Sequence, residues 1–383
     1  MNDYALPLSG LTAFEFCEVA AGPFCGMLLA DMGADVIKVE RLGQGDTLRH
    51  WPPITNGYSE NFASLNRNKK SIEVDVKDPA SRDALLNAIV EKADVIVENY
   101  RPGVMAANGF GYEAIAALRP EIVYCSLSAF GQTGPRSRQG GFDVTIQAMS
   151  GIMSITGEPD GAPVKAGTPV SDFATGLYGA FSIVSSILQA RASGKGCHVD
   201  ISMVGVSLAI SALQTSEFFG TGRTPRRLGS AHPRNAPYGA FKASDDYFVV
   251  AAGNDKLWAK VCSVVARVEL LEDPRFATTL LRAQNQDALK TILEEEFGSR
   301  PVKSWLTAFE EVGVPCSPIN SIPDALADPQ IDHLGLVQQL ILPDGTETKT
   351  FISPIRLTGE NLPIRHRPPK LGEHTESIFS KTK

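Results

Sequence analysis

The chain has 383 residues, and its 36 Lys and Arg against 43 Asp and Glu give a formal net charge of −7 at pH 7. Hydrophobic residues make up 43% and charged residues 21%, which is typical of folded chains and not of disordered ones. The length suits two or three domains and excludes a small stapled scaffold. The acidic balance favours neither nucleic acid nor a membrane surface as a partner, but it allows a local basic pocket for one anionic ligand.

The six cysteines form no C-x-x-C pair and have no histidine cluster nearby, so the sequence predicts no metal site. They are interpreted as scattered, mostly buried thiols, which favours a reducing, cytoplasmic location. The first residues lack the basic start and apolar core of a signal peptide. The most apolar stretch, residues 176–192, is broken by polar and small residues, so we expect no membrane span.

The first 130 residues alternate strand-like and helix-like patterns, which is typical of a parallel sheet with crossover helices. Pro23 opens one expected helix and Gly33 follows it at a left-handed cap, while Asp78 and Pro79 begin another. Strands are expected at 11–16, 35–39, 71–76, 95–97 and 122–127, and helices at 23–32 and 79–92.

Residues 130–169 are rich in Gly, Ser and Thr and too long for an ordinary connection, so this segment is expected to line a site. Helical patterns follow at 173–192 and 203–219. Beyond these, a strand at 247–252 and helices at 256–268 and 283–297 indicate a second, smaller α+β domain. We therefore expect a large domain at 1–200, a connecting helix at 201–224, a small domain at 225–325, and an arm at 326–383 that returns to the large domain.

Common catalytic and nucleotide-binding motifs find little support. Gly109, Gly111 and Ala114 match a dinucleotide fingerprint, but they do not follow a strand and open a helix, so a turn between two short helices is favoured. The serine-hydrolase elbow, the P-loop and the zinc-protease motif are absent. His232 and His374 fall in polar loops, where exposure or a structural hydrogen bond is expected.

Asp172 is the most informative acid, because it lies where a Gly- and Pro-rich loop meets a helix. Asp is a preferred N-cap residue and is stabilised by the positive end of a helix. With a reference pKa of about 3.9, an Asp is ionised at pH 7, and an ionised carboxylate is also a nucleophile. Its position alone leaves both roles open.

A series of motifs then occurs in one order along nearly the whole chain, and together they closely resemble the class III CoA-transferases, the CaiB/BaiF family. Each motif is weak alone, but their joint order is specific. The matching segments are Ala21–Pro23, Leu29–Arg41, Gly45–Asp46, Asn68–Ile72, Val97–Gly103, Phe130–Pro135, Thr175–Gly176, Gly313–Pro315 with Pro318, Asp328–Gln330 and Leu371–Thr375.

The resemblance implies an α/β fold with a Rossmann-like parallel sheet in the large domain, a smaller α+β domain, and a homodimer of two interlocked chains. It implies an enzyme with acyl-CoA and carboxylate substrates and no permanently bound cofactor. Asp172 falls on the family's catalytic aspartate, which carries an anhydride and then a CoA thioester. By motif position, CoA contacts fall to Val19, Ala20, Arg41, Val74, Lys77, Asn99 and Arg101.

Two features of the implied site depend on small residues. Backbone amides near Gly140 and Gly141, next to Phe142, or around Ala20 and Ala21, are candidates to stabilise an oxyanion, because a missing side chain lets the main chain approach a substrate. Turn formation by the two glycines is the alternative. Residues 106–108 read Ala-Ala-Asn where relatives carry an Arg, which leaves Arg101 as the candidate replacement.

The branch of the family is suggested by three segments, Leu228–His232, Ala236–Lys242 and Val250–Asn254, which resemble the succinyl-CoA:dicarboxylate transferases. The formyl-CoA:oxalate type is disfavoured because its glycine-rich loop has no counterpart here. The free carboxylate of a dicarboxylate would then meet an arginine. The candidates are Arg67, Arg226, Arg227 and Arg234.

Two alternatives remain. An α-methylacyl-CoA racemase of the same fold uses a His where this chain has Phe142, and a phenylalanine cannot shuttle a proton. A non-catalytic acyl-CoA-binding protein would keep the pocket without turnover, and the retained Asp172 argues against it.

Overall fold

The computed structural model describes residues 5–380. Within this range the chain divides into two compact units, and each is described by itself. Unit 1 comprises Met1–Ile152, Lys165–Arg223 and Pro329–Lys383, and unit 2 comprises Met153–Val164 and Thr224–Asp328.

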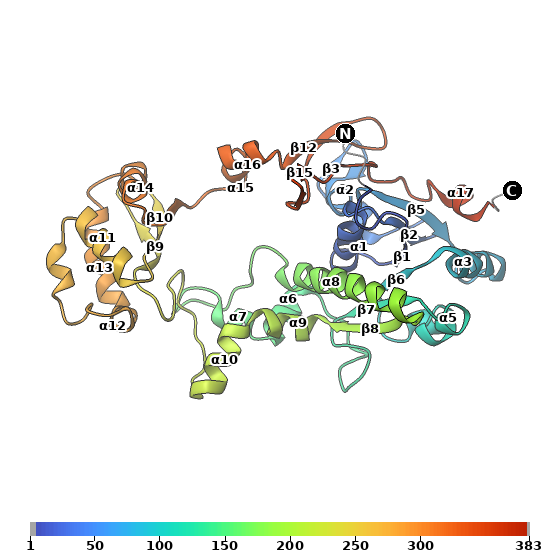
Figure 1. Cartoon of the computed structure of the whole chain (residues 1–383), viewed down its shortest axis with the longest axis horizontal. Coiled ribbons are helices and arrows are strands. Elements are labelled where there is room, and N and C mark those ends of the chain that lie inside the picture. Colours follow the sequence, from blue (N-terminus) through green and yellow to red (C-terminus); the bar gives the residue numbers. More distant parts are fainter. Residues whose placement is uncertain (1–4, 381–383) are drawn as a thin grey trace. The chain divides into compact units, whose positions relative to one another are not determined.

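Unit 1 is built on a six-stranded, all-parallel sheet (Figure 1). The strands lie in the order β5-β2-β1-β6-β7-β8. The chain first builds the half from β1 outward to β5 and then the half from β6 outward to β8, so the strand order reverses at the boundary between β1 and β6. Open α/β sheets bind ligands at such a switch point, beyond the carboxyl ends of the strands. The strands are β1 (Thr12–Phe16), β2 (Asp35–Arg41), β5 (Lys69–Val74), β6 (Val95–Glu98), β7 (Val123–Ser128) and β8 (Cys197–Ser202).

The parallel sheet expected from the sequence is therefore confirmed, with one strand that the sequence analysis missed. β8 is the edge strand beside β7. Its polar residues His198 and Asp200 are exposed, and Ile201 is its one buried residue. A strand with so few buried apolar side chains gives a weak sequence signal.

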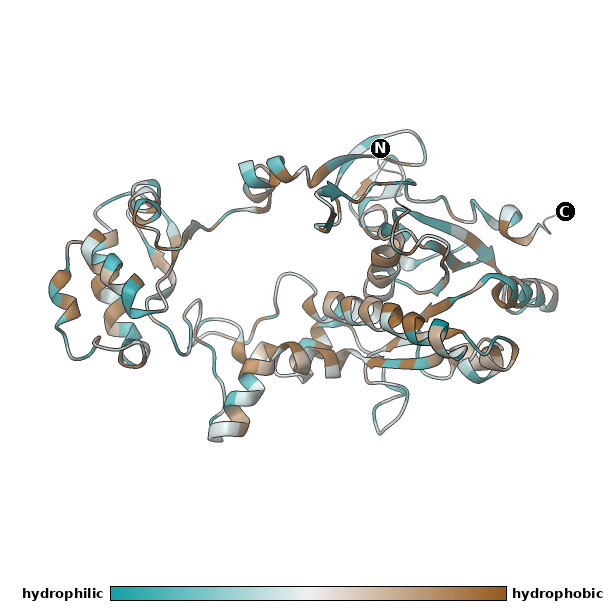
Figure 2. Ribbon diagram, in the orientation of Figure 1, coloured by the Kyte–Doolittle hydropathy of each residue, from teal (hydrophilic) through white to brown (hydrophobic). Residues whose placement is uncertain are grey.

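Helices cover both faces of the sheet, and successive residues of β1 show why. Ala13 and Phe14 are both fully buried and, as neighbours in a strand, point to opposite faces. Ala13 belongs to the core beneath α1 (Ala21–Asp31) and α8 (Val170–Ser193). Phe14 belongs to the core beneath α3 (Pro79–Lys92), α4 (Val104–Ala107), α5 (Tyr112–Leu118) and α17 (Thr375–Phe379). Figure 2 shows hydrophobic and hydrophilic residues alternating along both the strands and the helices.

The helix ends follow the sequence signals. Asp78 accepts a hydrogen bond from Ser81 N at 2.8 Å, and Pro79 occupies the first turn of α3. Gly33, with φ of +110°, follows α1 in the conformation that glycine tolerates. Gly109, with φ of +87°, lies in the turn between α4 and α5, which confirms that its motif belongs to a turn and not to a nucleotide site.

α8 is the one helix within residues 5–380 that is long and apolar enough to cross a membrane by length and composition. Core helices of globular domains pass the same test. α8 packs on α1, on β7 and β8, and on α9 (Met203–Ile210), and 33% of its most apolar window is buried in unit 1.

The predicted helix at 203–219 is two helices, α9 and α10 (Ala212–Thr221), which meet at Ser211. The hydroxyl of Ser211 donates to Ser207 O at 2.9 Å, and Ser211 N donates to Leu208 O at 3.1 Å in a tighter turn. The remaining elements of unit 1 are η1 (Thr47–His50), β3 (Ile54–Thr55), β4 (Tyr58–Ser59), α2 (Glu60–Asn66), α6 (Asp143–Met149), α16 (Pro329–Leu334), β12 (Val337–Ile341), β13 (Glu347–Phe351), β14 (Arg356–Leu357) and β15 (Glu360–Asn361), while α7 (Ile152–Ile155) spans the boundary between the units.

The C-terminal segment is tied to the β5 side of unit 1. Asn68, with φ of +63°, accepts hydrogen bonds through Oδ1 from Arg365 N at 2.6 Å and from His366 N at 2.9 Å. His374 N donates to Ser71 O at 2.9 Å, and Ser71 N donates to His374 Nδ1 at 3.2 Å. The segment thereby covers the open edge of the sheet, and His374 has a structural role, one of the two expected for it.

Unit 2 is an α+β unit with a three-stranded antiparallel sheet in the order β11-β10-β9. Its core contains Trp258, Phe297 and Trp305, all nearly inaccessible to solvent. The strands are β9 (Tyr238–Lys242), β10 (Tyr247–Ala251) and β11 (Cys316–Pro318). The helices are α11 (Asp255–Val264), η2 (Val268–Leu271), α12 (Thr279–Gln284), α13 (Gln286–Phe297), α14 (Val302–Glu311) and α15 (Ile322–Leu326).

The segment Met153–Val164, which the sequence analysis placed in the large domain, belongs to unit 2. Gly229 N donates to Gly157 O at 2.9 Å, and Arg227 Nε donates to Glu158 O at 3.2 Å. All six cysteines are unpaired thiols, four of them buried. No group of three or more His, Cys, Asp or Glu side chains between residues 5 and 380 is arranged to hold a metal ion.

Candidate active site

A cavity of about 410 Å³ opens at the carboxyl ends of β1, β6 and β7, where the strand order changes direction. Its wall includes nine of the residues predicted from the sequence. These are Val19, Ala20, Arg41, Asn99, Arg101, Gly140, Gly141, Phe142 and Asp172. Residues from segments more than 100 positions apart thus meet at one edge of the sheet.

Val74 and Lys77, predicted as CoA contacts, do not line this cavity. Val74 is buried in the core at the end of β5, and Lys77 is exposed in the loop that follows. β5 lies two strands away from β1, which separates their ends by roughly 10 Å at the usual spacing of neighbouring strands.

The sequence analysis missed other residues of the wall. Glu18, Tyr100 and Pro102 adjoin predicted residues, and Gln139 precedes Gly140. The end of β7 contributes a further group, Leu127, Ser128 and Ala129. Their signal was available, because β7 was an expected strand and parallel strands end at the same edge of a sheet.

Asp172 is the third residue of α8, whose N-cap is Pro169. The interpretation of Asp172 as an N-cap is therefore wrong. Instead, the Asp143 carboxylate accepts a hydrogen bond from Ser171 N at 2.9 Å at this helix end. The Asp172 side chain is half-buried, lines the cavity, and has no hydrogen bond or ion pair within the described part of the chain.

Burial raises the pKa of Asp172 to about 7, and the neighbouring Asp143 carboxylate adds to the increase. This corrects the expectation of a fully ionised side chain at pH 7. A carboxylate of higher pKa is a stronger nucleophile once it is ionised, so the same environment that holds the proton also increases reactivity above pH 7.

Close packing of α8 against α1 fixes where Asp172 lies. A Cβ on Gly176, one turn after Asp172, would lie 2.7 Å from Ala21 O and 2.9 Å from Phe24 Cδ1. Only glycine allows the two helices this approach. The contact holds the N-terminal end of α8, which carries Asp172, against Ala20 and Ala21, which line the same cavity.

Neither Gly140 nor Gly141 has a positive φ, so neither needs glycine for its backbone conformation, and what distinguishes both is a close contact. A Cβ on Gly140 would lie 2.8 Å from Arg101 Nη2, and one on Gly141 would lie 2.7 Å from Ala129 Cβ. The loop therefore passes closely over the guanidinium of Arg101. The structure favours the close-approach alternative over turn formation.

The candidate arginines differ in exposure, in ion pairing and in the unit to which they belong. Arg41 and Arg101 are exposed and lie in its wall, so they are suited to meet phosphate groups. Arg67, a candidate for a substrate carboxylate, is 3% exposed and pairs with Asp31 through Nη2 at 2.6 Å, which removes it as a candidate. Arg226, Arg227 and Arg234 belong to unit 2.

Comparison with known proteins places the chain in a family. The model of CoA-transferase family III matches residues 8–375. The chain is 39% identical to succinate–glutarate CoA-transferase of Agrobacterium fabrum over 381 residues, covering 98% of this chain and 95% of the relative. It is 38% identical to acetyl-CoA:oxalate CoA-transferase of Acetobacter aceti, covering 97% and 95%.

A solved structure gives the same result. The crystal structure of a CaiB/BaiF family protein from Brucella suis matches with a TM-score of 0.86 and 37% identity, covering 98% of this chain and 99% of that one. With the family model spanning nearly the whole sequence and the site built at the switch point of the sheet, the chain belongs to CoA-transferase family III and is a CoA-transferase.

Proposed function

We propose that this enzyme moves CoA from succinyl-CoA, or a similar acyl-CoA, to a free dicarboxylate, and that Asp172 carries the transferred groups. The observation that supports it most directly is the unpaired carboxylate of Asp172 in the wall of a cavity that also holds Arg41 and Arg101. The names of the relatives support the substrate class: one acts on succinate and glutarate, the other on oxalate. All three acids are dicarboxylates.

The reaction proceeds in four substitutions at carbonyl carbon. Asp172 attacks the thioester, and the C–S bond breaks to release CoA thiolate and leave a mixed anhydride on Asp172. The thiolate then attacks the Asp172 carbonyl, which releases the donor carboxylate and forms an aspartyl-CoA thioester. The acceptor carboxylate and the thiolate repeat these two steps in reverse, so Asp172 is regenerated without net proton transfer.

The cavity supplies what these steps need. Each tetrahedral intermediate places negative charge on an oxygen, and backbone N–H groups at Ala20 or in the Gly140–Gly141 loop are the donors that the small side chains expose. Arg41 and Arg101 neutralise CoA phosphates. The side-chain amide of Asn99 holds the backbone of Glu18 in the wall: Asn99 Oδ1 accepts from Glu18 N at 3.0 Å, and Asn99 Nδ2 donates to Glu18 O at 2.8 Å.

The aspartyl intermediates can be trapped. The protein is incubated with succinyl-CoA and then hydroxylamine, and the peptide containing Asp172 is analysed by mass spectrometry. We expect an aspartyl hydroxamate at Asp172, and none in Asp172→Ala, whose turnover should fall by at least roughly 10³-fold because the nucleophile is lost.

Asp143→Ala is the control, since it removes the neighbouring carboxylate. Asp172 should still form the hydroxamate in this variant, because Asp143 itself is not the modified residue. An unmodified Asp172 peptide during measurable turnover contradicts the mechanism. A panel of oxalate, glutarate and monocarboxylates against several acyl-CoAs then identifies the donor and acceptor, and turnover with monocarboxylates alone contradicts the substrate class.

We further propose that two copies of the chain form the functional homodimer, interlocked as the family resemblance implies. Several large apolar side chains on three helices of unit 1 are exposed in the single chain, which is unusual for a monomeric protein. They are Leu177, Tyr178, Phe181 and Leu188 on α8, Leu208 and Ile210 on α9, and Leu213, Phe218 and Phe219 on α10.

A further inference from the structure

The turn between β1 and α1, residues 17–20, lines the cavity with Glu18, Val19 and Ala20. Val19 has φ of +68°, a left-handed conformation that a β-branched residue avoids unless neighbouring groups impose it. The turn therefore stores strain beside the reacting groups, and something in the fold must maintain it.

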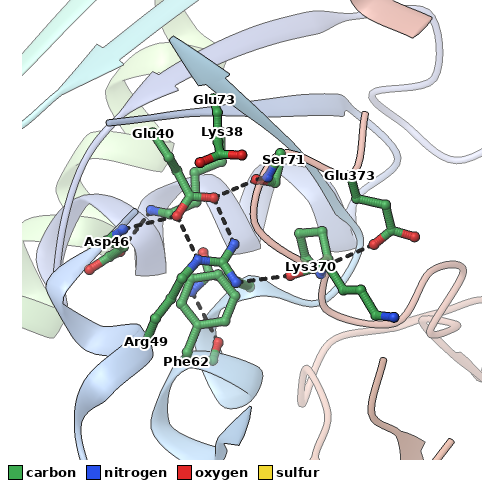
Figure 3. A network of polar contacts seen from close by, with 12 residues as sticks. Lys38, Glu40, Asp46, Arg49, Phe62, Ser71, Glu73, Lys370 and Glu373 are labelled. Carbon is green, nitrogen blue, oxygen red and sulfur yellow. Dashed lines mark hydrogen bonds and ion pairs between the residues drawn. The ribbon is translucent and has the colours of Figure 1, made fainter. Parts of the chain in front are cut away.

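Asp46 is the group that holds Val19. Its Oδ1 accepts hydrogen bonds from Val19 N at 3.1 Å and from Leu48 N at 2.9 Å. Its Oδ2 lies 2.8 Å from Lys38 Nζ, and Asp46 N donates to Glu40 Oε2 at 2.9 Å. Figure 3 shows Lys38, Glu40 and Asp46 converging on one another.

Lys38 holds the other end of the turn. Its Nζ donates to Cys17 O at 2.7 Å and to Glu15 Oε1 at 3.0 Å. Glu15 in turn pairs with Lys69 at 2.7 Å, and Lys69 donates to Pro23 O at 2.8 Å in the first turn of α1. One chain of buried polar contacts thus fixes the backbone at positions 17, 19 and 23.

The burial of these charges explains their rigidity. The side chains of Lys38, Asp46, Glu15 and Lys69 are fully buried, and two cations balance two anions. Burial alone would lower the pKa of Lys38, but Asp46 and Glu15 raise it, and Lys38 keeps the pKa of Asp46 below its usual value despite burial. Removing one partner leaves a buried charge unpaired, so the network has one favourable arrangement.

We infer that Asp46 and Lys38 are positioning residues for CoA transfer, which hold Val19 in its left-handed conformation and thereby fix the cavity wall at Val19 and Ala20. Neither side chain lines the cavity. The inference rests on the proposed reaction at Asp172, because the turn matters for catalysis only if the reaction occurs in this cavity.

The test compares Asp46→Ala with Asp31→Ala in the full-length protein. Asp31 is a matched control, since it is 3% exposed, pairs with buried Arg67, and does not line the cavity. Both variants should lose stability. We expect kcat to fall roughly 10- to 100-fold in Asp46→Ala, because a small displacement of the wall costs that much. In Asp31→Ala it should stay within about threefold, measured with the best substrate pair from the panel.

A double-mutant cycle supplies the readout that a merely structural role would not change. Glycine adopts φ of +68° without strain, so in a Val19→Gly background the turn depends less on Asp46. The loss of kcat caused by Asp46→Ala should be at least several-fold smaller in that background. An equal loss in both backgrounds, or an Asp46→Ala variant that only loses stability as Asp31→Ala does, overturns the inference.

If Asp46→Ala does not fold, Asp46→Asn carries the same cycle, because asparagine keeps the size of the side chain but its one acceptor oxygen cannot serve both Val19 N and Lys38 Nζ. Failure of the proposed function gives a different result: Asp172→Ala would then retain turnover whatever residue stands at position 46. Native turnover that depends on Asp172 but is indifferent to residue 46 overturns the positioning role alone.

Discussion

At the residue scale, the two carboxylates near the start of α8, Asp143 and Asp172, differ in their hydrogen bonding. Asp143 is committed to structure, since it accepts hydrogen bonds from Ser171 N at 2.9 Å and from Gln147 Nε2 at 2.6 Å. Asp172 is left without a partner and faces the cavity. Burial, with a smaller contribution from Asp143, raises the pKa of Asp172, and perturbed pKa values of this kind are common at functional sites.

The pH dependence of kcat/KM follows from this pair. The pKa of Asp172 is raised to about 7, and only its ionised form attacks a thioester. The value of kcat/KM should therefore be constant well above pH 7 and fall about tenfold per unit well below it. Initial rates between pH 5 and 9, at a low concentration of a donor whose acyl group does not titrate, measure this limb.

Asp143→Asn tests what raises the pKa of Asp172. It removes the neighbouring charge but keeps an oxygen for Ser171 N, so the acid limb should move to lower pH. Burial remains the larger cause of the shift, so a limb near pH 4 in this variant would contradict the ranking of the two causes, and an unmoved limb would show that Asp143 does not contribute.

Helix packing is the decisive feature at the element scale. α8 contributes Asp172 in its first turn and Gly176 in its second, and Gly176 sets the distance to α1. Asp172 and the β1–α1 turn are thereby positioned by two elements in direct contact, each anchored separately in the core.

Gly176→Ala should move these elements apart. The new Cβ would lie 2.7 Å from Ala21 O and 3.2 Å from Cys25 N, both backbone atoms that cannot rotate away. We expect about 1–3 kcal/mol of lost stability, as for other overpacked cores, and a fall in kcat of at least roughly tenfold. Thermal melting and steady-state kinetics measure the two effects.

Gly220→Ala is the matched control, because Gly220 is also inside a helix and a Cβ there would meet nothing within 4 Å. It should leave kcat unchanged and stabilise α10 by up to about 1 kcal/mol. Equal behaviour of the two variants would show that the contact between α8 and α1 does not position Asp172.

The sequence predicted the elements of the whole molecule better than their spatial relations. Buried strands such as β1 and capped helices such as α3 leave local signals, and Asp172 was found because the motif order was specific. Val74 and Lys77 lie outside the wall of this cavity, because motif neighbourhood does not report how many strands separate two loops. Lys38 and Asp46 lie in motif segments, but no role was predicted for either, since that role depends on burial and on a backbone angle that appears only in the fold.

The exposed apolar helices carry the last prediction, on the whole molecule. If α8, α9 and α10 are covered by a second chain, sedimentation should give the mass of two chains, and Phe181→Asp should yield monomers or aggregates, since Phe181 is 72% exposed in the single chain. Leu118→Asp, on α5 and 54% exposed, is the control and should remain dimeric. A native monomer at micromolar concentration contradicts the proposal.

Interlocking adds a kinetic consequence that simple docking lacks. Two chains threaded through each other can separate only if one of them unfolds at least in part, whereas docked chains exchange at the dissociation rate of their interface. When tagged and untagged dimers are mixed in buffer, dimers with one tagged and one untagged chain should therefore not appear over many hours. Such hybrid dimers should form readily after the mixture is unfolded and refolded together. Hybrid dimers appearing in buffer while circular dichroism reports fully folded protein would show that the chains dock without threading.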